Sequence, residues 1–249
     1  MLTELVFPDP AGYADLATLV RRAKQADPDA AVRLQASGGV LRVWVGVLPG
    51  SGLLADGAAV GVRGIALAGP AEGSTAGGST DNDLDLVCSA SALLDRFARD
   101  GVGATSMTLP TVSAYAAWSG ALPATGGWTP AGVLSASDLI AAATSGIAEI
   151  SEGVGPAGTV AGARAVEELR RRVWARPVPV GAVGARDGGA GPPVTTIEAP
   201  GVGVDVTAGA AFAAYVLGFL PDATASIRVW RSGRWVRLQT QVGHVVARP

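Results

Sequence analysis

The feature that most constrains this chain is a short pattern that stands near both of its ends. Residues 32–43 read VRLQASGGVLRV and residues 227–238 read IRVWRSGRWVRL, and the two align without a gap. Apolar and polar residues alternate on both sides of a Ser-Gly turn, which is typical of a β-hairpin with one buried face. Each copy also follows a predicted helix and a Pro-Asp dipeptide. We therefore expect a duplicated helix–hairpin unit, at about residues 9–48 and 207–249.

The alternation favours an even two-residue loop centred on the Ser-Gly pair, because a slip of one residue would turn every side chain to the opposite face. The apolar residues of each hairpin then share one face. The other face carries the candidate binding residues, with Arg33 opposite Arg42 in the first copy and Arg228 opposite Arg237, beside Trp230 and Trp235, in the second. Facing arginines destabilise a sheet. They indicate either a structural cover of arginine stems over tryptophan rings, or a surface that stacks planar groups and holds an anion.

The rest of the chain predicts an α+β fold with a mainly antiparallel sheet and helices packed on it. Apolar periodicity predicts helices at about 89–99, 135–152, 161–175 and 208–220. Stretches rich in glycine and proline predict a mobile loop at 69–80 and a linker-like excursion at 177–205. We expect a single compact domain, 1–249, in which the helix–hairpin units are related by approximate two-fold symmetry.

Composition excludes several classes of site. The single Cys88 rules out an internal disulfide and a thiolate metal cage. The alternating Asp81, Asp83 and Asp85 lack the glycine and the distal glutamate of a calcium-binding loop, so no metal or cofactor is expected. The most apolar run, 206–220, is too short to span a bilayer. Because the first residues do not form a signal peptide, we expect a cytoplasmic protein without a membrane partner.

Charge and aromatic residues are unevenly spread. The net charge is −2, but residues 1–160 carry 15 acids and 8 bases, whereas residues 161–249 carry 6 acids and 11 bases. The basic end either recognises an anion or docks on the acidic end of the same molecule. Residues 101–137 contain no charged side chain. This segment is predicted to be either a strap over the protein's own core or an interface with a partner.

Three stretches carry a resemblance to a family. They are FPDPAGYADL near the start, RVWVGVL after the first hairpin, and the closing GHVVARP. With these stretches the chain resembles an uncharacterised family of small cytoplasmic proteins from high-GC, actinobacterial-type bacteria. The resemblance covers most of the chain and implies no activity.

Three hypotheses for function follow from these patterns. The first is a non-catalytic binding or adaptor protein, whose arginine–tryptophan surface binds a protein or a small anionic ligand. The second is an enzyme for a small anionic substrate, with Arg228 and Arg237 holding the anion and His244 as acid or base. The third is a nucleic-acid-binding protein that uses the basic C-terminal part, which would bind with strong salt dependence. The overall acidity of the chain disfavours this third hypothesis, and the sequence does not predict the oligomeric state.

Overall fold

The computed structural model describes residues 3–52, 55–68, 84–154, 162–179 and 205–249. Helices and mainly antiparallel strands make up the chain, which confirms the predicted α+β fold. They form two compact units: unit 1 comprises Met1–Val47 and Val60–Ala121, and unit 2 comprises Leu48–Ala59 and Leu122–Pro249. The expectation that both share one core stays a prediction. All of the predicted loop 69–80 and most of the predicted excursion 177–205 lie outside the described residues.

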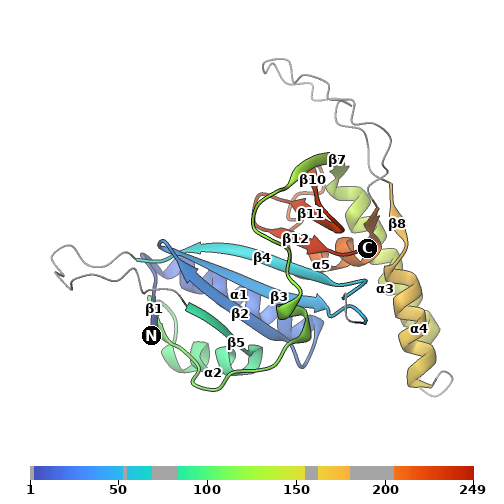
Figure 1. The fold of residues 1–249 in the computed structure, drawn as a ribbon. Helices are drawn as coiled ribbons and strands as arrows, with labels where there is room; N and C mark the ends of the chain where they lie inside the picture. Colours follow the sequence, from blue (N-terminus) through green and yellow to red (C-terminus); the bar gives the residue numbers. More distant parts are fainter. Residues whose placement is uncertain (1–2, 53–54, 69–83, 155–161, 180–204) are drawn as a thin grey trace, which may run out of the picture. The chain divides into compact units, whose positions relative to one another are not determined.

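Unit 1 is built around the first hairpin. Its elements are β1 (Glu4–Val6), α1 (Pro10–Ala26), β2 (Ala31–Ser37), β3 (Val40–Leu48), β4 (Ala59–Ala66), β5 (Leu84–Ser89), α2 (Ala90–Asp100), β6 (Ser106–Thr108) and the 3₁₀ helix η1 (Ala117–Gly120) (Figure 1). The sheet has the order β5-β2-β3-β4, and β1 pairs with β6. Helix α1 begins directly after Asp9, whose carboxylate caps it by accepting hydrogen bonds from the amides of Ala11 and Gly12.

Unit 2 is built around the second hairpin. Its elements are β7 (Thr129–Ser135), α3 (Ala136–Val154), α4 (Ala163–Trp174), β8 (Pro177–Val178), β9 (Val206–Thr207), α5 (Ala208–Val216), β10 (Ser226–Ser232), β11 (Trp235–Gln239) and β12 (His244–Ala247) (Figure 1). The sheet has the order β7-β10-β11-β12, and α3 packs against α4 and α5. Helix α5 is the predicted core helix, and most of its residues are buried. Among the described residues, no helix has the length and apolar character needed to cross a membrane.

The two units share one topology, read from different starting points. Unit 1 runs β1-α1-β2-β3-β4-β5-α2-β6. In chain order unit 2 runs β7-α3-α4-β8-β9-α5-β10-β11-β12. If its first four elements are placed after the last, the order becomes β9-α5-β10-β11-β12-β7-α3-α4-β8. The sheet orders match under the same correspondence, with β5 equivalent to β7 and β4 equivalent to β12. Unit 2 is therefore a circular permutation of unit 1 with α4 added, and the predicted duplication extends beyond the hairpins.

A repeated helix start supports this correspondence. The sequence Ser-Ala-Ser stands at 89–91, where β5 becomes α2, and again at 135–137, where β7 becomes α3. In both places the first serine caps the helix by accepting a bond from the amide three residues later. In both places the following alanine amide donates to a carbonyl just before the hairpin, at 2.8 Å from Ala90 to Ala30 and at 2.9 Å from Ala136 to Ala225.

The pairing inside the hairpins differs from the expected one by two residues. The turns are Gly38-Gly39 and Gly233-Arg234, not the Ser-Gly pairs, since each turn begins with a glycine at positive φ. Moving the turn centre by one residue changes every cross-strand partner by two and leaves the faces unchanged. The predicted apolar faces are accordingly buried: Val32, Leu34, Leu41 and Val43 in the first hairpin, and Ile227, Val229, Val236 and Leu238 in the second.

The expected arginine pairs are therefore wrong. Arg33 lies opposite Trp44 and Arg42 opposite Gln35. In the second hairpin Arg228 lies opposite Gln239, Arg237 opposite Trp230, and Trp235 opposite Ser232. Each arginine thus faces a neutral partner, which removes the repulsion that the expected register implied.

The segment before unit 2 packs on β3 through one tryptophan. Trp118 of η1 is 6% exposed, and a Cβ added at Gly46 would overlap its indole ring. The predicted strap is thus confirmed for this part of residues 101–137, whereas the side chain of Tyr115 is 91% exposed.

We expect Gly46→Ala to destabilise the protein by about 1–3 kcal/mol, because the new methyl group has to displace the Trp118 ring. Thermal unfolding monitored by tryptophan fluorescence measures the change. Gly64→Ala is the matched control, since its Cβ would meet Val40 Cγ1 at an ordinary 3.7 Å. An equal melting temperature for the two variants would show that the Trp118 contact is not needed.

Candidate functional site

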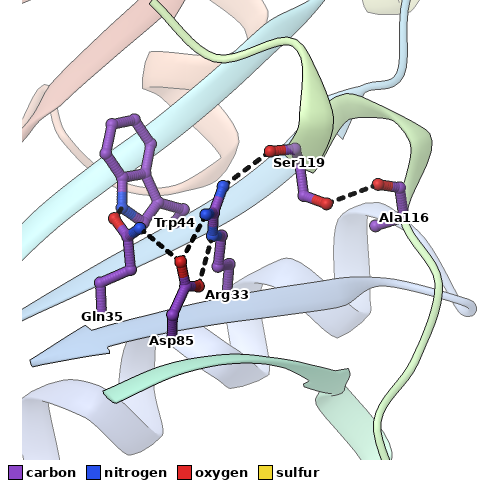
Figure 2. A network of polar contacts seen from close by, with 6 residues as sticks. All are labelled: Arg33, Gln35, Trp44, Asp85, Ala116 and Ser119. Carbon is purple, nitrogen blue, oxygen red and sulfur yellow. Dashed lines mark hydrogen bonds and ion pairs between the residues drawn. The ribbon is translucent and has the colours of Figure 1, made fainter. Parts of the chain in front are cut away.

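On the polar face of the unit 1 hairpin, Arg33, Gln35 and Trp44 are held in a network of contacts within the unit (Figure 2). Arg33 donates from Nε and Nη2 to the two carboxylate oxygens of Asp85, at 2.7 and 2.6 Å. Its Nη1 donates to the carbonyl of Ser119 in η1, at 2.6 Å. Gln35 donates to Asp85 and accepts a bond from the Trp44 indole N–H. Asp85 therefore neutralises the charge of Arg33, and each of the three guanidinium nitrogens donates a hydrogen bond inside unit 1.

The equivalent face of unit 2 has a different chemistry. The Arg237 guanidinium carbon lies 4.8 Å from the ring centre of Trp128 and 5.2 Å from that of Trp230. Both distances are within cation–π range. Arg228 is exposed two residues before Trp230 in the same strand, and therefore on the same face. We call Arg228, Trp230, Arg237 and Trp128 the Arg–Trp face.

No acid neutralises the Arg–Trp face among the described residues: neither Arg228 nor Arg237 forms an ion pair there. The reason lies in one position of the edge strand. Asp85 of β5 lies opposite Gln35, and the equivalent residue of β7, opposite Trp230, is Pro130. A proline thus stands where unit 1 has its carboxylate.

Two polar atoms of the Arg–Trp face are hidden and unsatisfied. Trp230 Nε1 and Arg237 Nε are shielded from solvent and find no hydrogen-bond partner among the described residues. Burial also lowers the pKa of the Arg237 guanidinium. Because a buried donor without a partner costs free energy, these two atoms lower the stability of unit 2 rather than raise it.

His244 lies opposite Gln239 at the start of β12. Burial, and then the charge of Arg237, lower the pKa of His244 to about 4. The imidazole is therefore neutral at neutral pH, and it is poorly matched to acid–base work there. Cys88 is no better suited as a nucleophile, since burial raises the pKa of its thiol to about 12.

The structure therefore divides the sequence-predicted site residues into two sets. Arg228, Trp230 and Arg237 lie together on unit 2, whereas Trp235 is buried beneath the Arg248 guanidinium, 6.0 Å from its ring centre. Arg33 and Arg42 belong to unit 1, where Arg33 is neutralised.

Sequence reasoning missed Asp85 as the partner of Arg33 and Trp128 as part of the Arg–Trp face. Trp128 had a signal, since it is one of the aromatic residues of the uncharged segment. Among the described residues, no group of ligands that suits a metal ion occurs.

We expect Asp85→Asn to cost about 1 kcal/mol or less at pH 7, since half of the Asp85 side chain is exposed to solvent. Hydrogen bonds from Arg33 hold the pKa of Asp85 below its usual range. The stabilisation is complete above the unfolded pKa of about 3.9 and is lost as the pH falls through the folded value. Urea unfolding of both proteins at pH 7 and pH 3 checks this. A difference that stays constant with pH would contradict it.

We expect His244→Gln to remove a loss of stability that the wild-type protein shows between pH 6.5 and 4. Unfolded His244 binds a proton near pH 6.5 but folded His244 only at about 4, so acidification across this range favours unfolding. The effect is at most about 3 kcal/mol. Urea unfolding of both proteins at pH 7.5 and 5 measures it. Equal pH dependence in the two proteins would show that His244 titrates normally.

The fold resembles that of DNA sliding clamps. A structure named "Caulobacter crescentus pol III beta" matches with a TM-score of 0.51 and 14% identity over 98% of this chain and 65% of that one. A second, the DNA polymerase sliding clamp from Caulobacter crescentus, matches with a TM-score of 0.50 and 14% identity over 99% and 65%. The chain thus spans about two thirds of the length of these proteins, and the likeness is one of fold.

The sequence itself identifies the family. The chain belongs to the family described as Domain of unknown function (DUF8185), whose model matches residues 123–249. A second model, Domain of unknown function (DUF8010), matches residues 1–120. The change from one match to the other at residues 120–123 coincides with a boundary between the units at 121/122, although residues 48–59 of unit 2 lie within the first match. No curated protein sequence matches the chain. The resemblance to an uncharacterised family is confirmed, and the high-GC bacterial origin stays a prediction.

Proposed function

We propose that this protein is a non-catalytic binding or adaptor protein, and that the Arg–Trp face recognises an anionic partner. The observation that carries the proposal is the contrast between the two units. Arg33 is neutralised by Asp85, whereas Arg228 and Arg237 have no ion pair among the described residues. At the equivalent positions 33 and 228 of the same fold, one arginine is therefore neutralised within its unit and the other is not, while Arg237 differs from its equivalent Arg42 in lying over two tryptophan rings.

The residue types of the Arg–Trp face support binding to another molecule. Arginine and tryptophan are the residues most enriched among those that contribute strongly to interface affinity. Arg237 also has no ion pair among the described residues, so an anion would supply the opposite charge that its own unit does not.

The fold likeness supports binding over catalysis. The matching structures are named as a DNA polymerase subunit and as a sliding clamp, and the name clamp describes binding rather than catalysis. His244, the acid–base candidate of the enzyme hypothesis, is poorly suited to that role at neutral pH, because burial lowers its pKa to about 4. A cytoplasmic location remains part of the proposal.

The decisive comparison is between two double variants with equal loss of charge. Arg228→Gln/Arg237→Gln removes the open arginines. Arg42→Gln/Arg170→Gln removes two exposed arginines from elsewhere, of which Arg42 is the unit 1 equivalent of Arg237. The titrants are polyglutamate and inorganic polyphosphate, and the signal is intrinsic tryptophan fluorescence, since Trp128 and Trp230 lie at the site.

We expect the wild-type protein and the control to bind at least one polyanion with equal affinity. The Arg228→Gln/Arg237→Gln variant should bind it at least about tenfold more weakly, since a hydrogen bond to a charged group contributes about 1.5–3 kcal/mol. Circular dichroism first confirms that both variants are folded. Equal affinities in the two variants, or no binding of either polyanion to the wild-type protein, would overturn the proposal.

A further inference from the structure

We infer that the partner of the Arg–Trp face is an acidic segment of another protein, held by its side chains. This inference rests on the proposed function and names the class of partner. It follows from the spacing of the groups on the face, from the charge of the whole chain and from the structure of the neighbouring edge strand.

The spacing of the Arg–Trp face fits an extended peptide. Arg228 and Trp230 are alternate residues of β10, so they lie on one face about 6.6–6.8 Å apart along the strand. Arg237 lies directly opposite Trp230. Alternate side chains of an extended peptide have the same spacing. One carboxylate would therefore meet Arg228 while the next side chain on the same face meets Trp230 and Arg237.

The stacked guanidinium selects the direction from which an anion approaches. Arg237 lies over the rings of Trp128 and Trp230. Its Nε is shielded from solvent, so a planar carboxylate would bind in the guanidinium plane through two parallel hydrogen bonds from Nη1 and Nη2. The rings supply an apolar surface beside that carboxylate. The segment that fits best thus combines acidic residues with a large apolar or aromatic one.

Charge favours a short acidic segment over a nucleic acid. The β10–β11 hairpin carries four arginines, Arg228, Arg231, Arg234 and Arg237, and no acid. The whole chain has a net charge of −2 and a pI of about 5.4. Nucleic-acid-binding domains are generally basic as a whole, because they follow a long phosphate backbone. A patch confined to one hairpin suits a ligand that needs only a few positive charges.

The edge of the sheet argues against binding by strand addition. β7 is the outer strand next to β10, and it carries Pro130 and a β-bulge opposite Val229/Trp230. Proline and bulges are features that prevent an edge strand from pairing with another chain. The partner is therefore held by side-chain contacts on the face of the sheet.

The test uses the full chain and three fluorescent probes of similar length. The first is a peptide of alternating glutamate and leucine with one tryptophan, the second the same peptide with glutamine for glutamate, and the third a single-stranded oligonucleotide. Fluorescence anisotropy at physiological salt gives the affinities. The proteins are the wild type, Arg228→Gln/Arg237→Gln, Trp128→Leu, and the Arg42→Gln/Arg170→Gln control.

We expect the acidic peptide to bind the wild type and the control equally, and at least tenfold more tightly than either other probe. The arginine variant and Trp128→Leu should each weaken it by tenfold or more. Tighter binding of the oligonucleotide, lost in the arginine variant, would overturn this inference and leave the proposed function standing. Sedimentation showing that two copies of this chain pair through the face would likewise overturn this inference and leave the proposed function standing. Failure of the peptide and of both polyanions would overturn both.

Discussion

Both units depend on the register that a left-handed glycine imposes on a two-residue turn. Gly38 and Gly233 take φ values of 60° and 57°, which side chains with a Cβ rarely adopt. They fix which residues face each other, and so they place the fully apolar faces in the core and the arginines on the other side. A slip of one residue would bury Arg33 and Arg228 and expose Val32 and Ile227. The core and the Arg–Trp face are thus two consequences of one constraint.

The permuted topology explains how one fold accommodates two chemistries. Circular permutation preserves the neighbours of every strand, so the apolar contacts that stabilise the unit are retained. The repeated Ser-Ala-Ser helix starts show that even individual hydrogen bonds are the same in the two units. The polar face is not under this constraint, since its side chains do not fill the core. On the edge strand, Asp85 in unit 1 stands against Pro130 in unit 2, so the carboxylate that neutralises Arg33 has no counterpart at the equivalent position beside Arg228.

The elements predictable from the sequence were those set by local periodicity and caps. Alternation in the hairpins, Asp9 before α1 and the apolar run of α5 each carry their structure in a few neighbouring residues. The two-residue change in pairing was not predictable in this way, because Ser-Gly and Gly-Gly both suit a tight turn and leave the same faces buried. The partner of Arg33 was equally out of reach. Asp85 is 52 residues away in sequence, and its place beside Arg33 depends on β5 pairing with β2.

The Arg–Trp face shows why such a site can be predicted only in part from a sequence. Its residue types were evident, because arginines and tryptophans alternate in one hairpin. Its proposed role in binding rests on the lack of a neutralising acid among the described residues. Such a lack can be recognised only by comparison with an equivalent position that has the acid. Unit 1 provides that comparison within the same chain. Asp85 neutralises Arg33, whereas the equivalent Arg228 and the tryptophan-stacked Arg237 have no ion pair among the described residues. This contrast supports the proposal that Arg228 and Arg237 serve a partner rather than the stability of the sheet.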